Sequence, residues 1–344
     1  MKKYIDNNFY CMDIRFNSIW IASFSINLDR TVDIKFINKR SVKSLFLNGK
    51  LNIACLEKEI RNVIYFIEKK IDEPIYSIYL TSDILNINSQ IQQIYLNIGI
   101  NKQVTNNHIK QSLTLLRDSE LPENRSILQV IPIKYNIDIG SVANPVGYKT
   151  PDLFTTYNVI TSDSASLTLI KNIFEKYQIS VIDIISRNYL ITKFGMLGID
   201  KNLPKLFIDI TSVTINISFV YKGKLVKCWC IQNTNLVMEY NSKENVYNVI
   251  QYIKNFLPLN ILNMIKYVVV YSSIKSDLEI VKIVRDIFEL DCKMLFNDSK
   301  NSSPIYYLVK YVVEQLINEN DYFSISSNKL NIFGLLKDII TETL

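Results

Sequence analysis

The chain repeats one order of expected secondary structure, and this repeat constrains its fold more than any other feature. Alternating apolar residues and one amphipathic stretch predict three strands, a helix and a strand, at 9–14, 19–24, 32–37, 53–71 and 75–80. The same order returns after Lys205, at 206–210, 213–221, 225–231, 246–256 and 267–271. Further helices at 277–290 and 304–318 are expected to close this second lobe. The repeat predicts a duplicated α/β domain with two lobes, whose ligands would lie beyond the strand ends in the cleft.

Length and composition agree with two globular lobes. The 344 residues exceed the roughly 100–200 residues of one domain, and 48% hydrophobic with 21% charged residues is ordinary for a folded protein. The formal charge of +6 comes from scattered residues rather than a basic stripe, so no nucleic-acid partner is expected. No apolar run approaches the roughly 20 residues that span a bilayer. Residues 1–8 do not resemble a signal peptide, so any membrane contact would be peripheral.

Cysteine and histidine usage argues against metal and nucleophile chemistry. None of the five cysteines forms a C-x-x-C pair, and Cys228 and Cys230 are expected as two small residues on one face of a strand. A metal site would need further ligands, and the one histidine, His108, is distant in sequence. The sequence therefore predicts no metal, no catalytic residues of the Ser/His/Asp or Cys/His kind, and a reducing, cytoplasmic compartment.

Residues 82–160 interrupt the first lobe as a unit of their own. Short strands at 92–98, 126–130, 134–137 and 155–160 are expected to surround a helix at 106–117. The first lobe then resumes with a helix at 164–177 and a strand at 181–185.

The most specific local pattern lies within this inserted unit. Residues 128–138 read LQVIPIKYNID, and residues 144–147 read NPVG, which is typical of a turn. This pattern resembles the signature of FtsA, in which V-I-P-x-x-Y-x-I-D precedes N-P-x-G. The alternative interpretation is that this segment is an ordinary buried pair of strands whose aromatic residue fills the core.

The resemblance to FtsA covers residues 9–320, but with few matching residues outside these motifs. It implies an α/β, two-lobed actin-like (ribonuclease H-like duplicated) fold with a small inserted α+β subdomain in the first lobe. It also implies that the inserted subdomain packs one molecule against the next in a filament, so that the protein itself is one of its partners.

The resemblance also identifies the segments where a nucleotide would bind. Actin-like proteins hold ATP with magnesium through glycine-rich hairpins that begin with Asp, because glycine allows positive φ and close backbone approach. This chain has only 8 glycines. It reads DIRFNS from Asp13 where the family has D-I-G-T-x-K, DITSVT from Asp209 where the family has D-I-G-G-G-T, and YSS from Tyr271 where the family has T-G-G. The degenerate ATP site would then consist of Asp13, Asp209, Thr214, Ser272 and Ser273.

Side chains at so many glycine positions predict that ATP binds weakly or not at all, and that the chain is not an ATP-hydrolysing enzyme. Arg15 could pair with phosphate, or it could cap the cleft by pairing with Asp209. The alternative is that Asp13, Asp209 and Thr214 still hold a magnesium nucleotide in a re-shaped loop.

The second lobe is short compared with the family. In FtsA an outer subdomain of this lobe receives the tail of FtsZ. The interval from Asp209 to Tyr271 is only about sixty residues, and the expected strands and helix use nearly all of it. The outer subdomain is therefore expected to be trimmed to 232–259 or lost, which puts the usual docking surface for FtsZ in question.

Residues 332–344 have an amphipathic helical pattern and follow a polar linker at 324–331. The residues expected to enter a membrane are Ile332, Phe333, Leu335, Leu336, Ile339, Ile340 and Leu344. At ~1.5 Å per residue such a helix is too short to span a bilayer, and it resembles the terminal helix with which FtsA lies in the membrane interface. Its one lysine is outweighed by Asp338 and Glu342, so anionic lipids would not attract it, and docking on the body of the protein is the alternative.

These patterns predict five parts. They are a first lobe (1–81 with 161–200), an inserted interaction subdomain (82–160), a second lobe (201–323), a linker (324–331) and a terminal amphipathic helix (332–344). The expected function is that of an FtsA-like division scaffold without catalysis, which self-associates and tethers FtsZ to the membrane. It would work on the cytoplasmic face of the bacterial inner membrane, at the division site. An active ATP-binding or ATP-hydrolysing protein and a pilus-assembly-type scaffold that binds a membrane partner's peptide are the alternatives.

Overall fold

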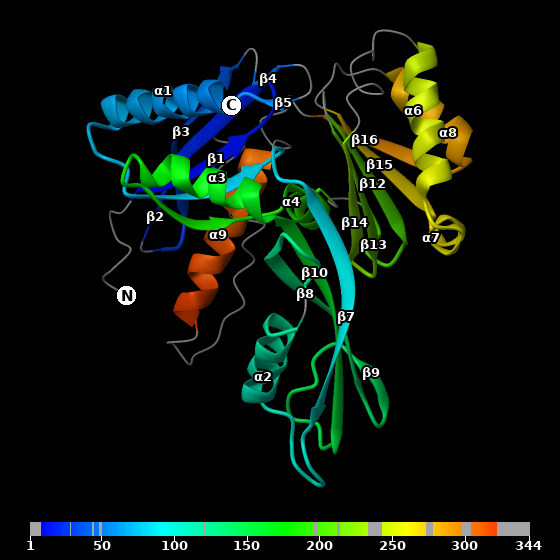
Figure 1. Cartoon of the computed structure of the whole chain (residues 1–344). Helices are drawn as coiled ribbons and strands as arrows, with labels where there is room; N and C mark the ends of the chain where they lie inside the picture. Colours follow the sequence, from blue (N-terminus) through cyan, green and yellow to red (C-terminus); the bar gives the residue numbers. More distant parts are fainter. Residues whose placement is uncertain are drawn as a thin grey trace. The chain divides into compact units, whose positions relative to one another are not determined.

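The structure is a computed structural model, and its described residues form two compact units (Figure 1). The first unit draws on residues 8–84, 169–194 and 296–321, and the second on residues 85–168 and 199–295. The ranges that the structure describes are 8–27, 29–42, 45–47, 50–119, 121–195, 199–211, 214–232, 243–272, 278–296 and 304–321.

The first unit is built on a five-stranded sheet with the order β11-β6-β1-β2-β3. Three antiparallel strands form a meander: β1 (Phe9–Ile14), β2 (Ser18–Ile26) and β3 (Val32–Ser41). Two further strands, β6 (Ser77–Ser82) and β11 (Ser180–Ile184), pair in parallel beside β1. A small hairpin of β4 (Phe46–Leu47) and β5 (Lys50–Leu51) follows the meander.

Helices cover both sides of this sheet. Helix α1 (Ile53–Ile71) begins where the side chain of Asn52 accepts the N–H of Cys55, and it buries the apolar stripe that its periodicity predicts. Helices α3 (Ser164–Glu175) and α4 (Arg187–Phe194) follow later in the chain, and α4 was not expected. Helix α9 (Pro304–Asp321) was expected in the second lobe, but it packs across β1, β2 and β6. Figure 1 shows α1 and α9 on opposite sides of the sheet.

The inserted unit is a four-stranded sheet, β7-β10-β8-β9, with one helix. Its elements are β7 (Ile87–Asn97), α2 (Asn106–Arg117), β8 (Arg125–Ile137), β9 (Gly140–Val142) and β10 (Asp152–Asp163). Alternation along β10 divides its side chains between two faces. Tyr157 and Val159 pack with Leu116 of α2 on one face, where the Tyr157 hydroxyl lies 2.5 Å from Ser112 Oγ. The even-numbered residues, such as Asn158, point to the other face.

The two short strands expected at 126–130 and 134–137 form the single strand β8, which passes through Pro132. A break in register between Thr156 and Tyr157 of β10 leaves one extra residue on β8 beside the proline. The next strand, β9, pairs only with Tyr135–Ile137. The proline therefore lies beside the irregular step, in a part of β8 that β9 does not pair with.

The sheet of the second lobe has the order β14-β13-β12-β15-β16 and the same connections as the first sheet. Its strands are β12 (Lys205–Ile210), β13 (Thr214–Tyr221), β14 (Lys224–Gln232), β15 (Tyr267–Ser272) and β16 (Asp291–Phe296). Strands β12 to β14 form an antiparallel meander, and β15 pairs with β12 in parallel. The sequence predicted all of these strands except β16. The repeated topology confirms the duplicated two-lobed fold.

Helices α6 (Lys243–Phe256), α7 (Leu259–Met264) and α8 (Leu278–Phe288) belong to the second lobe, and α7 was not expected. Helices α6 and α8 enclose the largest apolar cluster of this unit against the sheet. Strand β14 ends at Gln232 and α6 begins at Lys243. The intervening residues, 233–242, are too few for a folded subdomain.

The face of the inserted sheet that α2 does not cover packs against the edge strand β14. Ser89 Oγ accepts the N–H of Cys228 at 2.7 Å and donates to the carbonyl oxygen of Cys228 at 3.3 Å. Asn158 Nδ2 donates to the carbonyl oxygen of Leu225 at 3.0 Å. Lys224 and Lys227 donate in return to carbonyl oxygens of the inserted unit, and burial lowers the pKa of both ammonium groups. Side chains of the insertion thus satisfy backbone groups that an edge strand would otherwise expose.

Candidate functional site

The two meanders place equivalent turns after their first strands. Asp13 lies in β1, and the N–H of Arg15 donates to the carbonyl oxygen of Ser18 at 2.8 Å. Asp209 lies in β12, and the N–H of Thr211 donates to the carbonyl oxygen of Thr214 at 2.9 Å. The structure therefore puts Asp13 and Asp209 in matching positions of the two units, as their motifs predicted.

Arg15 fills the first turn. Its Nε donates to Asp13 Oδ2 at 2.6 Å, and its guanidinium carbon lies 5.1 Å from the centre of the Trp20 ring. Only 3% of Arg15 is exposed. A planar guanidinium suits this position because it can bond a carboxylate in its plane and stack on an indole with its face. Phe16, at the threonine position of the motif, is buried as well.

A second arginine, which the sequence did not point to, completes a buried charge cluster in the first unit. Arg187, the first residue of α4, lies with its Nη1 2.8 Å from Asp83 Oδ1 and 3.9 Å from Asp13 Oδ1. Arg187 is 1% exposed, and Asp13 and Asp83 are buried. Asp83 follows β6, and its N–H donates to the carbonyl oxygen of Ile14. Two carboxylates and two guanidinium groups thus compensate each other's charge.

One feature of the sequence could have indicated the pair of Asp83 and Arg187. In open α/β sheets, ligand and charged groups gather at the carboxyl ends of parallel strands. Asp83 directly follows β6, and Arg187 comes shortly after β11, which is the next parallel strand.

The turn of the second lobe is closed by its own hydroxyl groups. Thr211 Oγ1 accepts the N–H of Thr214 at 2.9 Å and lies 2.9 Å from Thr214 Oγ1. Asn216 Nδ2 lies 3.5 Å from Asp209 Oδ2. The N–H of Thr214, which a phosphate-binding turn would direct at its ligand, therefore has an internal partner.

The third predicted segment lies at the end of β15, next to β12. Tyr271 is fully buried and pairs in register with Asp209. Ser272 ends the strand and pairs with Ile210. Ser273 lies outside the described residues, as do the linker at 324–331 and the seven membrane-facing residues predicted in 332–344.

The described residues of the first turn do not fit a magnesium nucleotide, and residues 212 and 213 of the second turn lie outside the described ranges. A phosphate cradle needs N–H groups that point at the ligand and small residues that allow it to approach. Here buried arginine and phenylalanine side chains fill one turn, and a threonine hydroxyl takes the N–H of the other. A metal ion near Asp13 would also meet the positive charge of Arg15, which already holds that carboxylate.

Searches for other kinds of site in the described residues give two further findings. Within the described ranges, no three His, Cys, Asp or Glu side chains gather as they would around a metal ion. None of the described helices combines the length and apolar character that a membrane crossing requires.

Comparison with known proteins supports the fold and identifies the insertion. Among solved structures, a PilM-PilN type IV pilus biogenesis complex matches with a TM-score of 0.59 and 9% identity, over 89% of this chain and 98% of that chain. A Bacteroides thetaiotaomicron protein with an actin-like ATPase fold matches with a TM-score of 0.43 and 11% identity, over 90% and 99%. The ethanolamine utilization protein EutJ from Carboxydothermus hydrogenoformans matches with a TM-score of 0.46 and 9% identity, over 88% and 89%.

No curated protein matches the sequence significantly. Residues 85–161, however, match the family described as the SHS2 domain inserted in FtsA. The match covers β7 to β10, the elements that carry the VIP and NPVG motifs. The chain thus has an actin-like fold, and its residues 85–161 form an SHS2 domain of the kind inserted in FtsA.

Proposed function

We propose that this protein is a non-catalytic, FtsA-like scaffold that self-associates through its SHS2 domain and tethers FtsZ filaments to the inner face of the bacterial cytoplasmic membrane at the division site. The SHS2 match and the actin-like fold support an FtsA-like role. The amphipathic pattern of residues 332–344 supports the membrane tether.

The buried pair of Asp13 and Arg15 is the main support for the proposal that this protein is not a catalyst. A nucleotide site needs this carboxylate to orient water around a metal ion. In this protein the carboxylate instead neutralises an arginine that comes from a glycine position of the motif. Binding a metal there would require the protein to break the buried ion pair between Asp13 and Arg15, which is costly.

Calorimetric titration with magnesium ATP is the direct test. We expect no saturable heat with the full chain at millimolar nucleotide, because both described turns are filled or internally bonded. The variant Asp209→Ala should behave like the parent chain, and so should the control Asp291→Ala, which removes an exposed carboxylate from β16. Saturable binding that Asp209→Ala abolishes and Asp291→Ala retains would show that the site still works.

A pilus-type scaffold is the second candidate, and a specific feature favours it. The short segment at 233–242 leaves no room for the outer subdomain that the FtsA resemblance assigns to the FtsZ tail. The PilM-PilN complex shows an actin-like protein of nearly this extent together with a different partner. Under this candidate the protein would bind a short peptide of a membrane protein instead of FtsZ.

Flotation with liposomes separates the two candidates. We expect the full chain to carry FtsZ filaments into the lipid fraction, and a chain lacking residues 332–344 to leave both proteins at the bottom of the gradient. Burial of several large aliphatic residues, each contributing ~1.5–3 kcal/mol, is the physical basis of this expectation. A tail variant with Lys337→Ala, on the polar side of the helix, is the control and should still float. Flotation of the protein without FtsZ would favour the pilus-type candidate.

A further inference from the structure

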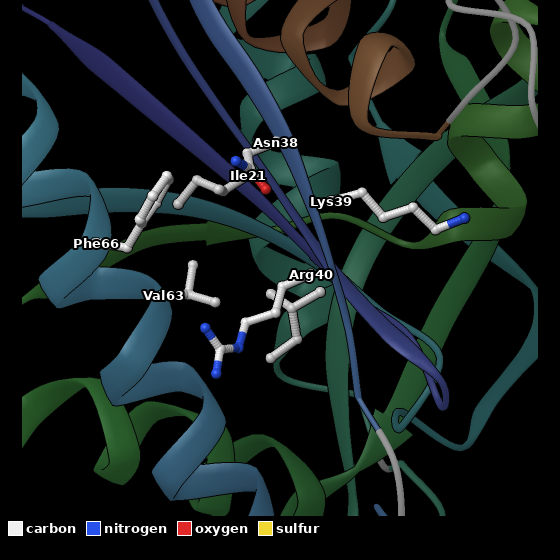
Figure 2. Close-up of a pocket in the computed structure, with 7 residues that line it drawn as sticks. Ile21, Asn38, Lys39, Arg40, Val63 and Phe66 are labelled. Carbon is white, nitrogen blue, oxygen red and sulfur yellow. The ribbon is translucent and has the colours of Figure 1, made fainter.

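A slot opens between edge strand β3 and helix α1 in the first unit (Figure 2). Its volume is about 240 Å³. Ile19 and Ile21 of β2 form the floor, and Val63 and Phe66 of α1 form the wall. Asn38 and Arg40 of β3 lie at the rim, because they pair with Ile21 and Ile19 and share their face of the sheet.

The strand at this rim is the end of its sheet. Among the described strands, β3 pairs only with β2. A break in register between Ser23 and Phe24 places a bulge at Lys35, so the regular part of the edge runs from Phe36 to Ser41. In the part of the chain that the structure describes, no strand pairs with this stretch on its outer side, and its residues Asn38, Lys39 and Arg40 line the slot.

Positive charge surrounds the slot. Arg40 Nε lies 2.7 Å from Glu59 Oε2 at one end, where the arginine side chain is half exposed. Lys70 lies over the ring of Phe36, 5.0 Å from its centre, on the α1 face. Lys39 lies on the other face of the edge, over Trp20. Three cations and one carboxylate flank the edge, so an acidic segment complements it.

The size of the slot favours a peptide side chain over a free small molecule. Small-molecule pockets usually enclose about 300–1,000 Å³, and this slot is smaller and open along the edge strand. In strand addition, main-chain hydrogen bonds to an open edge supply affinity, and pockets for alternate side chains supply specificity. An open edge with an apolar pocket beneath it is the arrangement that this mode of binding needs.

We propose that the edge of β3 between Phe36 and Ser41 binds an extended, acidic segment of a partner protein as a sixth strand, with one apolar side chain inserted between Val63 and Phe66. Carboxylates of the segment, on the face opposite its inserted apolar side chain, would lie beside Lys39. A second copy of this chain is a poorer occupant, because pairing of the two regular stretches would bring Lys39 and Arg40 of both copies together.

The test uses the full chain and a blocked heptapeptide in which glutamate and leucine alternate. We expect saturable binding by calorimetry, and slower hydrogen exchange at alternate amides of residues 36–41. Phe66→Glu should weaken binding about tenfold, because it puts a carboxylate into the slot. Tyr65→Glu is the matched control on the same helix and should stay within about twofold. Phe66 is 44% and Tyr65 is 67% exposed, so both variants should fold.

Charge is tested separately. Lys39→Glu should weaken binding about fivefold, whereas Lys58→Glu, an exposed residue of α1, should have little effect. A peptide of the same composition with its leucines consecutive should bind weakly, because only one face of a strand meets the slot. The proposal is overturned if the alternating peptide does not bind, if Phe66→Glu binds it as tightly as the parent chain, or if residues 36–41 gain no protection. A concentration-dependent dimer that Phe66→Glu disrupts would assign the edge to a second copy instead.

Discussion

Replacing Arg187 with methionine is expected to lower the free energy of unfolding of the first unit by about 3–5 kcal/mol. The guanidinium is almost completely buried and lies 2.8 Å from Asp83 Oδ1 and 3.9 Å from Asp13 Oδ1. Methionine fills a similar volume but leaves Asp83 as a buried carboxylate without its arginine. The loss corresponds to a fall in melting temperature of about 10 °C for a unit of this size.

Hydrogen exchange of β1 and β6 would measure this change in the unit concerned, alongside thermal unfolding. The double variant Arg187→Met with Asp83→Asn should recover more than about 1 kcal/mol of the loss, because it also removes the buried negative charge that Arg187 had neutralised. Lys176→Met is the matched control. Lys176 pairs with Glu57 at 2.8 Å on the surface, and such pairs contribute less than about 1 kcal/mol. Equal effects of Arg187→Met and Lys176→Met would contradict the role given to the buried cluster.

The second large effect is expected where the SHS2 domain packs against β14. The double variant Ser89→Ala with Asn158→Ala removes three hydrogen bonds to the backbone of Cys228 and Leu225. Each buried backbone group left without a partner costs about 1–3 kcal/mol. For three such groups we therefore expect a total loss of about 3–9 kcal/mol in the stability of this contact.

Limited proteolysis and hydrogen exchange at the N–H of Cys228 would report the loss directly. Ser126→Ala is the control in the same sheet, because the Ser126 hydroxyl bonds to Ser164 at the start of α3 rather than to a group of β14. If the double variant retains the protection of Cys228, another interaction must hold the two sheets together. Burial raises the pKa of the Cys228 thiol to about 11, so thiol labelling at neutral pH should also be slow until this contact opens.

Local patterns in the sequence predicted most of the fold. The stripe of apolar residues in α1 and the meanders after Phe9 and Leu206 depend on periodicity within one segment, and the structure confirms them. Strand β8 was predicted as two strands, because the cost of proline in a strand depends on whether its N–H side faces an edge. The partner of α9 could not be predicted, because an amphipathic helix shows which face is buried but not against which sheet.

The sequence located the residues of the candidate site at strand ends, but not their partners from distant segments. The DI motifs located Asp13 and Asp209, because both lie at a strand end that the pattern defines. The partners of Asp13 were harder to foresee. Arg187 is far from Asp13 in sequence, and only the order of strands in the sheet brings them together. The motif suggested a phosphate or Asp209 as partners of Arg15, and the structure adds Asp13 as a partner.

The position of α9 has a consequence for synthesis of the protein on the ribosome. The first sheet is complete once β11 has emerged, but α9 is translated after the whole second lobe. Until then the packing of α9 on β1, β2 and β6 is missing, and that side of the sheet stays exposed to water. The first unit therefore reaches its final packing only after α9 has been synthesised, and nascent chains that stall before Pro304 would expose apolar surface to chaperones.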